Sequence, residues 1–273
     1  MNTATLAFIG GGNMARSLIG GLVERGFPAA AIRVSEPLDA AREALAADFA
    51  VAVFSDNGAA CAGADLVVLA VKPQVMKTVA RDLAAALGHR PLVVSIAAGI
   101  PVDALQSWLG AAVPIVRCMP NTPALVHQGA SGLYPSPLVS EAQRALAEQL
   151  FSAVGIVAWL DREADIDAVT ALSGSGPAYF FLLMEAMQQA GEALGLTPDT
   201  ARRLTLQTAL GAATMAAGSD VEAAELRRRV TSPAGTTERA INTFLAGDLP
   251  RLVADAMAAA ETRAREMAAE FTG

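Results

Sequence analysis

The stretch that most constrains the fold lies close to the start of the chain. The apolar run TLAFI at residues 5–9 leads directly into the turn GGGNMA at residues 10–15. Gly10 permits a tight turn, Gly12 lets the backbone approach a pyrophosphate, and Ala15 lets the following helix pack closely on the strand. Bound phosphates would meet the N-terminus of that helix, where unpaired N–H groups and the helix dipole favour negative charge. The pattern predicts the strand and helix that open a dinucleotide-binding unit.

The first half of the chain continues this alternation of strand and helix. An amphipathic pattern at residues 17–23, closed by Gly26, favours the cofactor-binding interpretation over a merely flexible turn. The later strands are apolar throughout, as expected when helices cover both faces of a sheet. Residues 1–161 are therefore predicted to form an α/β domain with a doubly wound, Rossmann-type parallel sheet. Further strands are expected at residues 32–35, 51–53, 66–71, 92–96, 114–118 and 156–159, and helices at about 39–47, from 57, after 73, at 102–109 and at about 141–151, with a proline-rich loop after 118.

The second half, residues 162–273, shows only helical patterns. It is rich in Ala and Leu and has few aromatic residues, so its apolar faces need a partner surface on which to be buried. We therefore expect an all-α C-terminal domain that dimerises through interleaved helices. These helices are expected at residues 178–194, 198–217, 221–229, 235–245 and 249–270.

Composition narrows the class of protein. A net charge of −7 argues against binding nucleic acid or an acidic membrane surface. The first residues lead directly into the expected strand without a basic stretch or a long apolar run, and the apolar run at residues 180–184 is stopped by Glu185, so neither export nor a membrane span is expected. Cys61 and Cys118 fall in segments expected to be buried, which indicates a reducing, cytoplasmic setting. The two histidines have no ligand-spaced partners, so no metal site is expected.

The carboxyl ends of the parallel strands are expected to form the cofactor crevice. After the second strand, Ser35 suits the 2′-phosphate of NADP, whereas Glu36 would repel that phosphate and suits the ribose hydroxyls of NAD. Arg33 and Arg42 are possible counter-charges for a phosphate. These residues leave the preference between the two cofactors open.

Three more strand ends face the same crevice. In the last of them, two prolines fix the backbone so that Asn121 and Thr122 present polar groups, which suits the nicotinamide end of a cofactor. A plain surface loop is the alternative, and Lys72 is equally compatible with a solvated lysine at a strand end. The three segments are AVKPQ at residues 70–74, SIAAG at 95–99 and RCMPNTP at 117–123.

Two glycine-containing motifs lie in the helical half. LSGSGPAY at residues 172–179 is interpreted as a helix start that permits close packing. VTSPAGTT at residues 230–237 places hydroxyl residues and Gly235 before a helix, so that free N–H groups form a seat for a small carboxylate. An ordinary capped helix start is the alternative. The side chains that would add hydrogen bonds to this carboxylate seat are Ser232, Thr236 and Thr237.

Together these motifs resemble those of one family, the pyrroline-5-carboxylate reductases, in order and spacing over essentially the whole chain. The resemblance implies that NAD(P)H delivers hydride to the C=N carbon of L-1-pyrroline-5-carboxylate and yields L-proline. It also implies that the helical domain forms a homodimer, with dimers often assembled into a homodecamer, a pentamer of dimers. The matching segments are residues 10–15, 70–74, 95–99, 117–123, 172–179 and 231–237.

The resemblance also implies roles for individual residues. Thr237, near the ring nitrogen of the cyclic imino acid substrate, is the candidate catalytic residue that orients the iminium and relays its proton. A protonated imine is already electrophilic, so alignment with the hydride donor matters more than acid catalysis. Glu36 stands where many NADPH users carry a neutral or basic residue, so we expect use of both cofactors, with NADPH mildly favoured by the family's habit. Besides Glu36 and Asn121, the implied cofactor contacts are Ile9, Gly10, Gly11, Gly12, Asn13, Met14, Ser35, Asn57, Ala70, Val71, Lys72, Pro73, Ile96, Ala97 and Ala98.

Other functions remain compatible with parts of this pattern. A two-domain dehydrogenase of small hydroxyacids would rely on a lysine in the helical domain, and residues 161–273 contain none. A reductase of another cyclic imine stays open, because ring size depends on pocket shape. A non-catalytic NAD(P)-sensing protein would keep the fold without turnover, but the carboxylate seat argues against it.

Overall fold

The computed structural model describes residues 4–110 and 113–272. Within them the chain forms two compact units. Unit 1 contains the residues up to Ser175 together with those from Ala260 onward, and unit 2 contains Gly176–Ala259. The boundary expected between residues 161 and 162 lies inside unit 1.

The described part of unit 1 is built on an eight-stranded sheet with the order β3-β2-β1-β4-β5-β6-β7-β8. Strands β1 to β6 are parallel, as predicted, whereas β7 runs antiparallel to β6 and β8 runs parallel to β7. Ile9 at the end of β1 stands between Ser35 of β2 and Leu69 of β4, so the segments that follow these strands leave the sheet at one edge. The strands are β1 (Leu6–Ile9), β2 (Ile32–Ser35), β3 (Ala52–Phe54), β4 (Leu66–Leu69), β5 (Leu92–Ser95), β6 (Ile115–Met119), β7 (Gly129–Pro135) and β8 (Gly155–Trp159).

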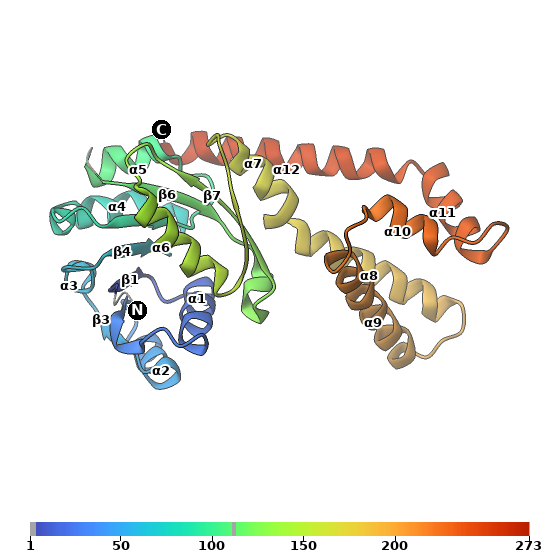
Figure 1. The fold of residues 1–273 in the computed structure, drawn as a ribbon, viewed down its shortest axis with the longest axis horizontal. Coiled ribbons are helices and arrows are strands. Elements are labelled where there is room, and N and C mark those ends of the chain that lie inside the picture. Colours follow the sequence, from blue (N-terminus) through green and yellow to red (C-terminus); the bar gives the residue numbers. More distant parts are fainter. Residues whose placement is uncertain (1–3, 111–112, 273) are drawn as a thin grey trace. The chain divides into compact units, whose positions relative to one another are not determined.

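Helices cover both faces of this sheet, as the uniformly apolar strands predict (Figure 1). Alternate residues of β1 enter two different cores: Phe8 lies in one with Leu18 of α1, and Ile9 lies in the other with Met76 of α4. Helices α1, α2 and α6 contribute to the first core, and α3, α4 and α5 to the second. The helices are α1 (Asn13–Glu24), α2 (Asp39–Phe49), α3 (Asn57–Cys61), α4 (Pro73–Leu83), α5 (Val102–Leu109), α6 (Glu141–Ser152) and α7 (Asp165–Val169).

Strand β7 occupies part of the segment expected to be a proline-rich loop. Its sequence, GASGLYP, lacks a continuous apolar run because two of its glycines lie against neighbouring elements. A Cβ on Gly129 would lie 2.9 Å from the carbonyl oxygen of Val154, and one on Gly132 would lie 2.8 Å from Cγ1 of Val169. These close approaches favour glycine over strand-forming residues, so the usual sequence signal of a strand is missing.

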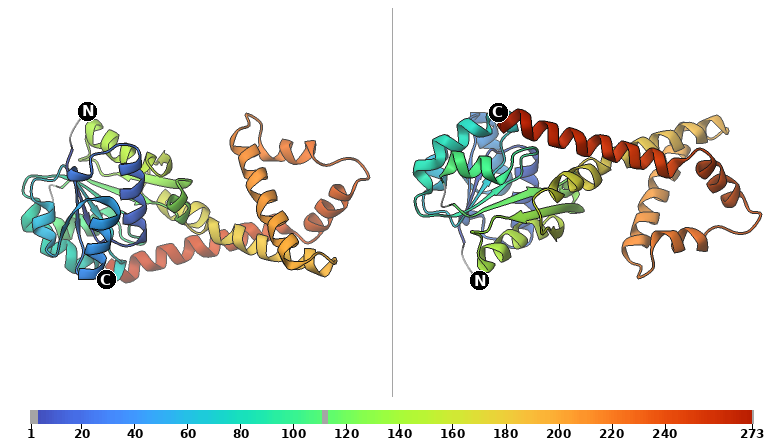
Figure 2. Two further views of the ribbon diagram at one scale, coloured as in Figure 1. Left: turned by 90° about the horizontal axis from the view of Figure 1, so that it is seen from below. Right: turned by 90° about the horizontal axis from the view of Figure 1, so that it is seen from above.

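Unit 2 consists of helices joined by short loops, with no strand among its residues Gly176–Ala259 (Figure 2). Helix α9 begins at Pro198, and the Thr197 side chain accepts a hydrogen bond from the Thr200 N–H, which caps its first turn. Phe180 and Phe181 on α8 are each 64% exposed, so one copy of this unit leaves large apolar side chains in water. The helices are α8 (Gly176–Ala193), α9 (Pro198–Ala217), α10 (Ala223–Arg229), α11 (Thr236–Ala246) and the part of α12 (Leu249–Thr272) up to Ala259.

Two helical runs depart from a simple succession of separate helices. The run Asp165–Ala193 contains α7, a π-helical turn at Thr170–Gly174 and α8. By length and composition alone it could cross a membrane; its most apolar window has a mean hydropathy of 1.2 and is 17% buried. The last turns of α12 belong to unit 1, where Met267 lies against Gly99 and Phe271 packs against the core that contains α4 and α5.

Candidate active site

The turn after β1 is held tightly against the turn after β4. Gly10 has a φ of +100°, which favours glycine. A Cβ at this position would lie 2.7 Å from the carbonyl oxygen of Ala70 and 3.2 Å from Cγ1 of Val71. The Gly10 N–H also donates to the carbonyl of Ser35 at 2.8 Å. The structure thus brings together three of the predicted cofactor-binding segments around Gly10.

Gly11 and Gly12 differ in what surrounds them. A Cβ on Gly11 would lie 2.5 Å from Cδ1 of Leu45, so glycine lets the loop lie on α2. A Cβ on Gly12 would meet no atom within 4 Å, and Gly12 begins α1 without a side-chain cap. An open, uncapped helix start with the positive end of the helix dipole fits a pyrophosphate. The remaining predicted residues of this segment are buried Ile9, exposed Asn13 and half-buried Met14.

The polar residues after β2 form hydrogen bonds with neighbouring loops. The Ser35 hydroxyl donates to Oδ1 of Asn57 at 2.7 Å, and Ser35 is buried. The Glu36 carboxylate accepts the Gly11 N–H at 3.0 Å and the Leu38 N–H at 3.2 Å. Ser35 therefore connects the end of β2 to the start of α3, whereas Glu36 places a negative charge beside the glycine loop.

The ends of β4 and β5 offer backbone groups and small side chains. Lys72 is the N-cap of α4, with Pro73 at the first helical position, and the lysine is exposed. After β5, the Ser95 hydroxyl accepts the Ala97 N–H at 3.4 Å, which fixes the course of this turn. Lys72 adds a positive charge at this edge of the sheet. The other predicted contacts on these two turns are Ala70, Val71, Ile96 and Ala98.

The side chain of Asn121 is engaged within the protein. Its Nδ2 donates to the carbonyl of Ser173 at 3.1 Å, and its Oδ1 accepts the Ala130 N–H at 2.9 Å. The residue is buried, and each polar atom of its amide has one partner within the protein. Asn121 ties the loop after β6 to the π-helical turn Thr170–Gly174, and its contact with the nicotinamide stays a prediction.

That π-helical turn is a feature that the sequence analysis missed. The motif around it predicts a helix start, whereas the structure continues from α7 through the turn into α8. A Cβ on Gly174 would lie 2.7 Å from Cε of Met119, so a larger residue here would require the methionine side chain at the end of β6 to move. π-helical turns are frequent at functional sites. The paired glycines of SGSG were the available signal for this close approach.

The predicted carboxylate seat lies in unit 2, at the start of α11. Gly235 is the N-cap of α11 and provides no side-chain cap, and its own N–H donates to the carbonyl of Ser232 at 3.0 Å. The Glu238 carboxylate accepts the Ala234 N–H at 2.8 Å, which holds the preceding turn. The first N–H groups of α11 thus lack a side-chain acceptor from Gly235, as an anion seat requires. The hydroxyl residues of the seat are exposed Ser232, exposed Thr236 and half-buried Thr237.

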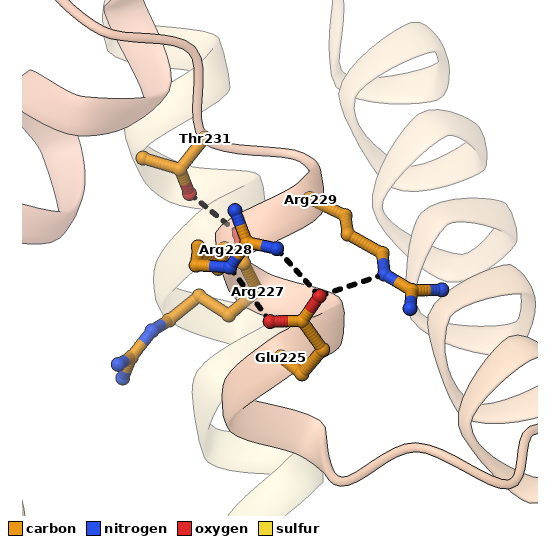
Figure 3. A network of polar contacts seen from close by, with 5 residues as sticks. All are labelled: Glu225, Arg227, Arg228, Arg229 and Thr231. Carbon is orange, nitrogen blue, oxygen red and sulfur yellow. Dashed lines mark hydrogen bonds and ion pairs between the residues drawn. The ribbon is translucent and has the colours of Figure 1, made fainter.

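The loop that leads to this seat is anchored to α10 (Figure 3). The Glu225 carboxylate accepts two hydrogen bonds from Arg228, at 2.6 and 2.7 Å, and one from Arg229 at 2.9 Å. These bonds hold the pKa of Glu225 below its usual range. The Thr231 hydroxyl donates to the carbonyl of Arg227 at 2.6 Å. The last turn of α10 and the first residues of the loop are therefore linked by hydrogen bonds.

A charged pair supports unit 1 near the end of β6. Arg117, whose side chain is 7% exposed, donates to Oε1 of Glu163 at 2.7 Å. The same oxygen accepts the Val102 N–H at 2.7 Å and so caps α5. Burial raises the pKa of neighbouring Asp167, an effect that the cations Arg117 and Arg265 partly offset. These groups join β6, α5, α7 and the last part of α12.

The two cysteines of unit 1 are poor nucleophiles. Burial raises the pKa of the Cys61 thiol to about 12 and that of Cys118 well above its ordinary range. Within residues 4–110 and 113–272, no group of three or more His, Cys, Asp or Glu side chains is arranged to hold a metal ion. The predicted site residues thus supply hydrogen bonds, helix starts and the opposite charges of Glu36 and Lys72.

Comparison with protein families gives two matches along the chain. Residues 163–267 match the family model for pyrroline-5-carboxylate reductase dimerisation. Residues 5–99 match the model described as NADP oxidoreductase coenzyme F420-dependent. The second match covers the glycine loop and the ends of β2, β4 and β5, which supports the assignment of unit 1 to cofactor binding.

Individual proteins match over almost the whole chain. The pyrroline-5-carboxylate reductase of Pseudomonas aeruginosa is 62% identical over 271 residues, 99% of each chain. That of Vibrio alginolyticus is 46% identical over 98% of each chain. A solved pyrroline-5-carboxylate reductase from Coxiella burnetii superimposes with a TM-score of 0.95 at 45% identity, over 97% of this chain and 99% of that one. The Plasmodium falciparum enzyme, solved with NADP bound, gives a TM-score of 0.86 at 28% identity, over 98% and 99% of the two chains. With both halves matched and relatives this similar over their full length, the chain belongs to the pyrroline-5-carboxylate reductase family.

Proposed function

We propose that this chain reduces L-1-pyrroline-5-carboxylate to L-proline, the last step of proline biosynthesis, with unit 1 holding NADH or NADPH and the start of α11 holding the substrate carboxylate. The main support for placing the substrate carboxylate at α11 is the start of this helix, which has no side-chain cap and has three hydroxyl residues in and next to its first turn. Family membership gives the reaction and its NAD(P)H dependence. The assignment of individual residues to cofactor and substrate rests on the geometry of each unit.

The residues of unit 1 fit a dinucleotide. Space beside Gly12 and the uncapped start of α1 accommodate a pyrophosphate, while Glu36 and Lys72 flank the glycine loop with opposite charges. When bound, the nicotinamide supplies the hydride. The chain's own contribution is to hold the donor and the C=N carbon in alignment, which accounts for the scarcity of acids and bases among the predicted contacts.

Thr237 is the proposed catalytic residue. Its half-buried hydroxyl lies in the first turn of α11, beside the carboxylate seat. A substrate whose carboxylate binds that helix start brings its ring nitrogen close to the same turn. The hydroxyl can then orient the protonated nitrogen and relay its proton. Ser232, Gly235 and Thr236 hold the carboxylate in this scheme.

The experiment compares Thr237→Ala with two controls. Thr237→Ala should lower kcat by at least about tenfold, because a positioned proton-transfer group contributes on that scale or more. Its Kd for NADPH, measured without the imine, should be unchanged. Thr237→Ser should restore most of the rate. Thr243→Ala removes a hydroxyl from the same helix, one that donates to the Arg239 carbonyl at 3.0 Å, and should leave kcat unchanged. Full activity in Thr237→Ala would refute the role.

Homo-oligomer formation belongs to the helical part of the chain, which carries the dimerisation match at residues 163–267. We propose a homodimer in which the exposed apolar faces of α8 and α9 meet a second copy. A groove on these helices, lined by Phe181, Met184 and Leu206 among others, supplies such a face. Assembly into a pentamer of dimers is proposed from the family resemblance. Sedimentation velocity at micromolar concentration distinguishes monomer, dimer and decamer.

We also propose a division into two domains and a cellular location. We assign residues 1–161 to dinucleotide binding and residues 162–273 to dimerisation and substrate binding, with the last turns of α12 folded onto unit 1. A cytoplasmic location is supported by two buried free cysteines, Cys61 and Cys118, as is usual in a reducing compartment. Fractionation of cells that express a tagged chain tests the location.

A further inference from the structure

The Glu36 carboxylate occupies the place where the adenosine ribose of a dinucleotide is expected. Glu36 directly follows β2, and its two oxygens accept the N–H groups of Gly11 at 3.0 Å and Leu38 at 3.2 Å. An acid at the end of the second strand typically bonds the ribose 2′-hydroxyl of NAD, whereas a nearby arginine accommodates the 2′-phosphate of NADP. Two backbone donors hold this acid in place before any cofactor arrives.

The first possible counter-charge, Arg42, is bound to the protein. Its Nη1 donates to the carbonyls of Glu36 at 2.6 Å and Pro37 at 2.9 Å, and its Nη2 pairs with Asp39. Its side chain is 19% exposed. A 2′-phosphate would have to displace these bonds to use Arg42. Arg42 therefore shapes the turn that carries Glu36, and its own charge is paired with Asp39.

The remaining phosphate-binding candidates are engaged as well. Nη1 of Arg33 donates to the carbonyl of Ala62 at 2.6 Å. The Ser35 hydroxyl donates to Asn57 and is buried. Arg33 and Ser35 thus each have a partner within the protein, while the group that suits a 2′-hydroxyl lies on the glycine loop.

We propose that Glu36 makes this chain bind NADH more tightly than NADPH, although both support turnover. This inference rests on the proposed function, and it reverses the mild preference for NADPH expected from the family resemblance. In NADH the 2′-hydroxyl donates to the carboxylate. In NADPH the 2′-phosphate meets the same carboxylate, and like charges at this separation repel. We expect the Kd for NADPH to exceed that for NADH by at least about tenfold.

Titration of the full-length protein with each cofactor, followed by fluorescence without any imine, measures the two constants directly. Glu36→Gln keeps an oxygen that can accept the Gly11 N–H but removes the charge. It should lower the ratio of the two Kd values by at least about tenfold, chiefly by tightening NADPH. Glu43→Gln removes the same charge from an exposed position on α2 and should leave the ratio unchanged.

A second pair of probes needs no variant. Competition of 5′-AMP and of adenosine 2′,5′-bisphosphate against bound NADH isolates the contribution of the 2′-phosphate. The bisphosphate should compete at least about tenfold more weakly. Equal or tighter binding of NADPH or of the bisphosphate to the wild type overturns the inference, as does an unchanged ratio in Glu36→Gln. These results would leave the proposed function intact, whereas failure of both cofactors to bind would overturn both.

Discussion

Removal of the Glu163 carboxylate tests how much unit 1 depends on its buried charged pair. Glu163→Ala leaves the Arg117 guanidinium without its bonded carboxylate and the first N–H of α5, from Val102, without its acceptor. Both bonds are 2.7 Å long and both end on the same oxygen. One substitution therefore leaves a charged donor and a backbone donor unsatisfied together.

The loss of folding stability expected for Glu163→Ala depends on how exposed the side chains of Arg117 and Glu163 are. Removing one partner of a buried ion pair costs about 3–5 kcal/mol, because the remaining charge has no compensation. Here Arg117 is 7% exposed but Glu163 is 26% exposed, so water can reach the vacated position and the lower end of that range applies. The lost cap adds about 1 kcal/mol. We expect a destabilisation of about 3–4 kcal/mol, which lowers the Tm by roughly 6–15 °C in a chain of this size.

Urea and thermal unfolding of the wild type and four variants provide the assay: Glu163→Ala, Glu163→Gln, Arg117→Met and the double variant Arg117→Met/Glu163→Ala. Protomer concentration must be fixed, because the stability of an oligomer depends on it. Glu163→Gln keeps an acceptor for both donors and should cost only about 1 kcal/mol. Arg117→Met/Glu163→Ala removes the guanidinium that the single variant leaves without its carboxylate, so the double variant should be more stable than Glu163→Ala by at least about 1 kcal/mol. A loss below about 1 kcal/mol in Glu163→Ala, or simple additivity in the double variant, would refute the reasoning.

Two further predictions concern the titration of buried groups. Burial raises the pKa of Asp167, so the folded state holds this proton to higher pH than the unfolded state, and ionisation costs stability as pH rises through the raised pKa. Asp167→Asn should therefore raise the Tm slightly at pH 7 and leave it unchanged near pH 3, where the wild-type carboxyl is protonated in both states; an equal gain at both pH values would contradict this. Because burial raises the pKa of Cys61 to about 12 and that of Cys118 as well, both thiols should react with Ellman's reagent at pH 8 at least about a hundredfold more slowly in the native protein than in urea.

Much of unit 1 could be predicted because its signals are local. A buried parallel strand shows as an apolar run, and the small residues of the loop after β1 show where backbone must approach a ligand or a neighbour. Strand β7 could not be predicted, because Gly129 and Gly132 are determined by contacts with Val154 and Val169, which lie far along the chain. The helices of the second half could also be predicted, because the spacing of their apolar residues is helical.

The roles of particular site residues were harder to predict. The spacing of prolines around Asn121 indicates a fixed loop, but its amide partner, the Ser173 carbonyl, lies 52 residues further on. The same holds for Arg42, which is a plausible phosphate ligand in the sequence and a backbone-bound side chain in the structure. Sequence shows which groups are available near a site, and tertiary contacts determine which of them are still available to a ligand.

The return of α12 to unit 1 affects the order in which the chain can fold during synthesis. Strands β1 to β8 are made first, whereas Met267 and Phe271, which lie against Gly99 within unit 1, follow after the whole of unit 2 has been made. Domains generally fold as units while the ribosome still elongates the chain. Until α12 has been made, the nascent cofactor-binding unit therefore exposes the apolar surface that Met267 and Phe271 contact in the folded chain. A ribosome that stalls within α11 would leave the sheet formed and this surface exposed to solvent.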